Sequence, residues 1–415
     1  MWRYRFIWFV LAVGMFFESQ AQTIVSPYSN NGLGELVSQG MPNHIGMGGL
    51  GIGAPSYWQI NSINPALLVN NALTTFNVGF QADMRNFRST NTDGSDGTAG
   101  LRFLNISFPI IPAKWTSNVA LLPYSTVNYD FFNDQPIAGT DLVARNRFTG
   151  EGGLTRMDWS NGIRLRNNLA IGVKASYLFG SIRNSSESVV EGDVSPYSVV
   201  YSDDVSYNDF ALEFGGYYRH SLTKTRALNF GVIYSPSTTL SGVRDEVFIR
   251  RADALPIQTS DVETGQQADF DLPESFGFGV SFQEINRFLV GVDVELNTGG
   301  EFSENPNLFR RRFRMSVGGE LIPNYTNVRN YFSRVNYRFG ITYEQVPYIV
   351  NDRELEDFSL SLGTSLPINT VSTVDMAFRY GFRGTTQNNL VQENYLQVVL
   401  GVTINERWFI KRRYD

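Results

Sequence analysis

The sequence predicts an all-β fold, a transmembrane antiparallel β-barrel of about 14 strands with an N-terminal plug in its lumen. Three observations predict it: an N-terminal export signal, segments in which apolar and polar residues alternate, and connections that alternate between short and long. Charged residues make up 18% of the chain and aromatic residues 14%. After the N-terminus, no run is long and apolar enough for a membrane helix, so strands would have to cross the bilayer.

Residues 1–21 are typical of a signal peptide. Arg3 and Arg5 give a basic start, residues 6–17 form an apolar run, and Ser19 and Ala21 are the small residues of a cleavage site. The run is shorter than the roughly 20 apolar residues that a spanning helix needs. We therefore expect residues 1–21 to be removed and the chain to reach the outer membrane.

Alternation with a period of two is clearest at residues 288–296, 374–383 and 396–404. Successive side chains of a strand point to opposite faces, and in a membrane barrel the apolar face meets lipid while the polar face lines the lumen. The same pattern along the chain predicts one barrel domain, residues 73–415, with 14 strands near residues 73–83, 100–109, 115–130, 154–166, 168–182, 206–220, 226–236, 270–282, 287–298, 310–321, 333–344, 356–366, 372–383 and 393–404.

The connections between these strands tend to alternate in length, as expected for long outer loops and short periplasmic turns. Two of the predicted loops, 183–205 and 237–269, are long enough to dock a membrane-protein partner. Short turns are predicted at 166–168, 222–226 and 283–287.

Residues 22–72 lack the strand pattern and are rich in glycine. Irregular backbone cannot face lipid, so this segment is expected in the lumen as a plug or hatch. The residues expected to shape it are Ser26, Pro27, Tyr28, Gly46, Gly48, Gly49, Gly51, Asn64 and Pro65.

Charged residues on the predicted strands must face inward, because an Arg or Lys facing lipid costs about 2–4 kcal/mol at the midplane. We expect Asp293, Glu295, Arg338 and Arg379 in the lumen. Two interpretations remain open: a polar network that holds the plug, or an Arg that binds a carboxylate.

Pro123 lies inside the predicted third strand, and proline cannot donate a hydrogen bond to the ladder. A break or bulge is therefore expected at Pro123, Tyr124 and Ser125. It is either a local kink or a gap through which a hydrophobic solute leaves sideways into lipid.

Several other functions are disfavoured. The Gly-rich stretch 46–51 fits G-x-G-x-x-G but lacks the strand and helix of a nucleotide site. Two His and no Cys predict no metal site and no cofactor, and the net charge of −6 offers no basic surface for nucleic acid. No G-x-S-x-G elbow is present, so no enzyme is predicted, although a triad formed only by the fold stays open.

A family resemblance rests on Ser-Pro-Tyr-Ser at 26–29, Gly-Leu-Gly-Glu-Leu at 32–36, Asn-Pro-Ala at 64–66, Pro-Tyr-Ser at 123–125, Leu-Phe-Gly at 178–180 and Leu-Pro-Glu-Ser-Phe at 272–276. In their order and spacing these motifs resemble the FadL-type long-chain fatty-acid transporters, in the form common in Bacteroidota. The resemblance implies a 14-stranded barrel with an N-terminal hatch, and passive uptake of hydrophobic small molecules such as long-chain fatty acids through a side opening. Some barrels of this type are subunits of larger envelope assemblies, so a structural or partner-binding role is the alternative.

Overall fold

A closed antiparallel β-barrel forms the body of the molecule in the computed structural model, which describes residues 26–89, 93–191, 197–252, 255–299, 311–350, 353–387 and 390–407. Strand β20 pairs with β2 along its whole length and closes the ring. The ring has 14 positions, as predicted, because β4 and β5 share one of them. The signal peptide predicted for residues 1–21 lies outside the described residues. The strands of the ring are β2 (Thr74–Arg88), β3 (Asp93–Ile111), β4 (Trp115–Pro123), β5 (Ser125–Pro136), β6 (Val143–Arg166), β7 (Leu169–Glu191), β8 (Tyr197–Ser221), β9 (Arg226–Ser235), β14 (Ser275–Glu284), β15 (Phe288–Asn297), β16 (Arg312–Leu321), β17 (Asn336–Val350), β18 (Arg353–Pro367), β19 (Thr373–Arg383) and β20 (Gln392–Glu406).

The alternation of the sequence becomes two faces of the wall. On β17, Phe339 and Ile341 are exposed on the outside, whereas Arg338 and Thr342 are buried on the inside. This is the reverse of a soluble protein, in which large apolar side chains are buried. No helix among the described residues is long and apolar enough to span a membrane.

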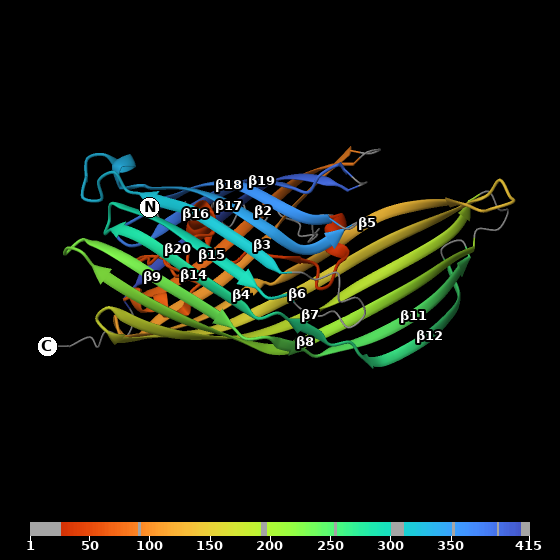
Figure 1. Cartoon of the computed structure of the whole chain (residues 1–415), viewed down its shortest axis with the longest axis horizontal. Helices are drawn as coiled ribbons and strands as arrows, with labels where there is room; N and C mark the ends of the chain where they lie inside the picture. Colours follow the sequence, from red (N-terminus) through yellow and green to blue (C-terminus); the bar gives the residue numbers. More distant parts are fainter. Residues whose placement is uncertain are drawn as a thin grey trace, which may run out of the picture.

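The N-terminal segment, residues 26–73, runs against the inner wall (Figure 1). It contains η1 (Pro27–Asn30), β1 (Glu35–Leu36), α2 (Pro42–Gly46) and η2 (Pro65–Asn70). Helix α2 contacts β17 to β20, and η2 contacts β4 and β6 to β8. Glycine makes this approach possible: a Cβ on Gly46 would lie 2.8 Å from the Cα of Gly363.

The two long loops predicted at 183–205 and 237–269 are largely strands. Strands β7 and β8 continue through the first. The second contains β10 (Thr238–Leu240), β11 (Gly242–Ala252) and β12 (Leu255–Gln267), and it is followed by β13 (Phe270–Leu272), which pairs with β10. The ends of β7 and β8 project beyond the barrel as a curved sheet together with β11, β12 and the adjoining parts of β5 and β6 (Figure 1). Because this extension lies beyond the ring, its strands need no continuous apolar face, and their sequences lack the regular alternation on which the prediction depended.

Candidate functional site

The wall of the barrel is interrupted at Pro123. The ladder between β3 and β4 ends where Leu104 pairs with Leu121. The N–H of Tyr124 donates to the carbonyl of Leu154 on β6 at 2.8 Å. Neighbouring residues of a strand point their backbone groups to opposite sides, so the nitrogen of Pro123 faces β3. Because proline has no N–H, the ladder to β3 cannot continue there.

Beyond this break, the N-terminal segment takes the place of β3. In β1, Leu36 pairs with Ser125 and Glu35 with Thr126. The N–H of Val37 donates to the carbonyl of Tyr124 at 2.9 Å. Among the described strands, residues 93–103 of β3 pair only with β2. Pro123, Tyr124 and Ser125 therefore mark the point where two neighbours in the wall separate.

A bulge lies opposite the break. On β3, Phe103 pairs with Gly79 and Leu101 with Phe80, so Arg102 is an extra residue without a partner on β2. If the β3–β4 register continued past Leu104, Arg102 would face Pro123. Bulges re-aim side chains, and here Arg102 and Phe103 both point inward, with exposed fractions of 4% and 2%.

The guanidinium of Arg102 has neutral hydrogen-bond partners. It donates to the side-chain carbonyl of Gln81 and to the backbone carbonyl of Ser38 in the N-terminal segment. No described carboxylate forms an ion pair with it, unlike most of the other inward-facing Arg side chains. A buried cation without a paired acid is costly unless something compensates it, and such a group is a candidate for anion binding.

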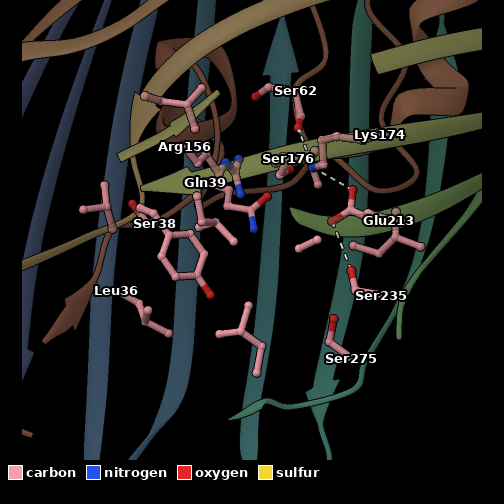
Figure 2. Close-up of a pocket in the computed structure, with 18 of the residues that line it drawn as sticks. Leu36, Ser38, Gln39, Ser62, Arg156, Lys174, Ser176, Glu213, Ser235 and Ser275 are labelled. Carbon is pink, nitrogen blue, oxygen red and sulfur yellow. Dashed lines mark hydrogen bonds and ion pairs between the residues drawn. The ribbon is translucent and has the colours of Figure 1, made fainter. Parts of the chain in front are cut away.

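Two cavities meet at Arg102 and Pro123, one on each side of residues 36–38. The first has a volume of about 160 Å³. Part of its lining is apolar, from Leu33, Leu36, Phe103, Leu122, Leu178, Phe270 and Leu272. Five basic and two acidic side chains also line it, and Figure 2 shows Lys174 between the carbonyl of Ser62 and Glu213, with Arg156 close by.

The second cavity has a volume of about 240 Å³ and lies between residues 98–102 of β3 and the lumen. Its charged lining is Arg85, Arg102, Arg312, Arg379, Arg383, Glu35, Asp83 and Glu344. Both cavities therefore carry more basic than acidic side chains, although the chain as a whole has a net charge of −6. Cavities with an excess of basic side chains attract anions.

Glu35 holds β1 in this position. Its carboxylate forms ion pairs with Arg85 and Arg383, each at 2.7 Å. Burial raises the pKa of Glu35, but the charges of Arg383 and Arg85 outweigh burial and leave it below its usual range. Glu35 therefore stays ionised and ties β1 to β2 and β19, the two strands that flank β20 in the wall.

The four charged residues predicted for the lumen occupy two different places. Asp293 accepts hydrogen bonds from the N–H groups of Gly51 and Ile52 at 2.6 and 2.7 Å, and Arg338 donates to Gln59 at 3.0 Å. These two contact the N-terminal segment away from the break. Glu295 lines the first cavity and pairs with Arg314 at 3.2 Å, whereas Arg379 lines the second.

The residues predicted to shape the plug make close contacts with the wall. Ser26 donates to Glu393 at 2.6 Å, Tyr28 donates to the carbonyl of Val391, and the side chain of Asn64 donates to the carbonyl of Gly216 at 3.1 Å. A Cβ on Gly172 would lie 2.4 Å from the carbonyl carbon of Pro65. Gly48 and Gly49 have φ of 69° and 86°, the left-handed region that glycine accepts readily.

The sequence did not indicate three of the Arg residues that line the cavities, namely Arg102, Arg85 and Arg156. Strict alternation counted from the outward-facing Leu104 would place Arg102 toward lipid, and only the bulge turns it inward. An Arg at a lipid-facing position was itself a signal, because such a position is costly and points to a local irregularity.

The fold defines a class, the FadL-like barrels. A *Pseudomonas putida* toluene transporter, TodX, is similar with a TM-score of 0.61 and 13% identity, over 90% of this chain and 100% of that one. A *Pseudomonas aeruginosa* FadL homologue gives 0.59 and 12%, over 89% and 98%. The *Ralstonia pickettii* toluene transporter TbuX gives 0.57 and 14%, over 89% and 98%. At these identities the likeness establishes the fold alone.

The family model that matches this chain is not that of the FadL-type transporters, which the sequence motifs resembled. The BamG family model matches residues 1–415, so the chain belongs to the BamG family. A comparison with curated proteins finds no match. The resemblance to FadL-type transporters is thus supported as a likeness of fold, and the Bacteroidota form stays a prediction.

Proposed function

We propose that this chain is an outer-membrane channel for passive uptake of hydrophobic small molecules, with residues 22–72 as its plug and a lateral exit at Pro123, Tyr124 and Ser125. One observation carries the proposal: the break in the β3–β4 ladder, the bulge at Arg102 and the two cavities coincide. The apolar outer surface of the ring supports the membrane location.

The lining of the cavities indicates which molecules would bind. Leu122, Leu178 and Phe270 offer apolar surface to a hydrocarbon tail, and Arg102 offers a cation without an acidic partner to an anionic head group. Arg binds carboxylates and phosphates through paired N–H donors. Long-chain fatty acids fit this arrangement better than neutral hydrocarbons do.

Release would require that residues 36–38 move. They separate the two cavities, and β1 covers the edge of β5 that β3 leaves unpaired. Displacement of β1 would join the cavities beside the unpaired edge of β3 and open a path through the wall. No cofactor takes part in such a passive step.

Binding to the purified protein tests the proposal. Dodecanoate, dodecyl phosphate and dodecanol share a chain length, and only the first two are anionic. We expect Arg102→Gln to weaken binding of the two anions about tenfold, the equivalent of one lost charge-assisted hydrogen bond, and to leave dodecanol unchanged. Arg88→Gln is the control, because Arg88 is exposed at the end of β2. If the wild-type protein binds none of the three, the channel proposal is wrong.

The projecting sheet favours a second candidate, a structural or partner-binding subunit of an outer-membrane complex. Strand β12 pairs only with β11 among the described strands, so its other edge is free. A free edge accepts an added strand from a partner. Purification in mild detergent separates the two candidates: a stoichiometric protein partner would favour this role, and a lone barrel that carries lipid would favour the channel.

A further inference from the structure

One connection at the short-turn end of the barrel is unusually long and ordered. Residues 322–335 join β16 to β17 and contain η3 (Tyr331–Arg334). Three asparagines at intervals of three residues cap its backbone. The side-chain carbonyls of Asn324, Asn327 and Asn330 accept from the N–H groups of Thr326, Arg329 and Phe332 at 3.0 to 3.1 Å. These bonds fix the shape of a turn that would otherwise be costly to order.

This turn presents apolar side chains to the outside. Phe332 is 68% exposed, and Tyr331 packs edge-on against it. The hydroxyl of Tyr331 donates to the carbonyl of Pro367, next to the exposed Ile368. We name the exposed set the rim platform, which comprises Leu321, Tyr331, Phe332, Tyr337 and Ile368.

The rim platform continues the apolar outer wall. Tyr337 belongs to the same outward-facing row of β17 as Phe339 and Ile341, and it pairs with Leu321 of β16. Its hydroxyl donates to the carbonyl of Phe332 at 3.2 Å. This bond places Phe332 on the outer side of the rim, directly beyond the outward-facing residues of β17. Arg334, at the other end of η3, lines a cavity with Tyr57 and Trp58 of the N-terminal segment.

A cation–π contact and an exposed cation accompany the platform. The guanidinium carbon of Arg334 lies 5.5 Å from the ring centre of Tyr331. Arg329 is exposed and forms no ion pair with the described residues. Aromatic side chains beside Arg are the composition of a membrane interface, where rings lie at head-group level and Arg reaches lipid phosphates.

We propose that the rim platform binds the head-group layer of the leaflet on this side of the membrane, with Arg329 on anionic head groups. The proposal rests on the outer-membrane location proposed above. The platform continues the lipid-facing wall, because the flanking strands carry the outward-facing Leu321 and Tyr337 next to the turn. This continuity favours lipid over a periplasmic protein as the ligand of the platform.

A single-cysteine experiment tests this, since the natural sequence has no cysteine. Phe332→Cys carries a bimane label in nanodiscs that contain brominated lipid, a short-range quencher. Phe339→Cys on the outer wall is the positive reference, and Lys224→Cys on the exposed turn after β8 is the aqueous control. We expect the label at 332 to lose fluorescence much as the label at 339 does, while the label at 224 keeps it.

The outcomes separate the two proposals. Quenching at 339 without quenching at 332 overturns the rim platform as a lipid site and leaves the barrel in the membrane. No quenching at either position overturns the membrane location itself. Adding anionic lipid should deepen the quenching at 332, and Arg329→Ser should remove that increase. If the increase persists in Arg329→Ser, the role of Arg329 is wrong.

Discussion

At the scale of single residues, the wall break depends on one missing N–H group. The nitrogen of Pro123 faces β3, where the continued register would place Arg102. The bulge on the other side of β3 gives Arg102 no backbone partner on β2. Two local irregularities, each tolerable alone, thus open one place in a closed ladder and turn a guanidinium toward it.

Pro123→Val is expected to narrow the break, because valine restores an N–H on the side of β3. Uptake of a long-chain fatty acid by cells should fall, whereas the amount of folded barrel stays constant, since no buried apolar area is lost. A radiolabelled fatty acid measures uptake, and a heat-modifiable gel band measures folding. Equal uptake at equal expression would show that Pro123 is only a kink.

His44 should make stability depend on pH. Burial, with the charge of Arg338, lowers its pKa from 6.5 to about 3. The unfolded chain therefore binds a proton at a pH where the folded one does not, and stability falls as pH drops from about 6.5 toward 3. His44→Gln should flatten this fall in the unfolding temperature. His220, which is exposed, provides the matched control: His220→Gln should keep the wild-type pH dependence.

At the scale of elements, the sequence predicted those strands whose outer face must be apolar to contact lipid. Strands β15, β19 and β20 were predicted to within two residues at each end for this reason. Strands β11 and β12 were missed because their sequences mix apolar and charged residues on one face, as Val243, Asp245 and Val247 do on β11. The bulge at Arg102 and the pairing of β1 with β5 could not be predicted, because both depend on contacts between distant parts of the chain.

Strand β1 is the element that would have to move in transport, and Glu35 fastens it. Glu35→Gln removes the charge shared by Arg85 and Arg383. Losing one partner of a buried ion pair costs about 3–5 kcal/mol, and the remaining acids Asp357 and Glu393 reduce that cost. We expect β1 to detach more often and single-channel conductance in planar bilayers to rise.

The matched control for Glu35→Gln is Asp130→Asn. Asp130 pairs with Arg147 at 2.7 Å, but both side chains are well exposed in the projecting sheet. Exposed pairs contribute about 0–1 kcal/mol, so conductance and folding should not change. If Glu35→Gln behaves like this control, β1 is held by its backbone pairing and not by charge.

At the scale of the whole molecule, the ring and its contents are separable. Strand β20 pairs with β2 without help from the N-terminal segment, so closure of the ring does not need that segment, although β1 pairs with β5 beyond the break. The segment in turn places four polar groups of the wall in contact with its backbone or side chains, at Asp293, Thr342, Arg338 and Glu393. These contacts indicate that the N-terminal segment fills the lumen more than it stabilises the wall.

Deletion of residues 22–72, with the signal peptide kept, is therefore expected to leave a folded barrel with a larger conductance. The deletion exposes inward-facing charges to water rather than to lipid, which solvates them and limits the loss of stability. The heat-modifiable band reports the folded barrel, and planar bilayers report the conductance. Part of the lumen would remain covered by an apolar cluster that includes Leu240 and Phe270 from β10 and β13. A folded deletion variant with unchanged conductance would assign closure of the lumen to that cluster, and would leave the N-terminal segment only the role of lining the cavities.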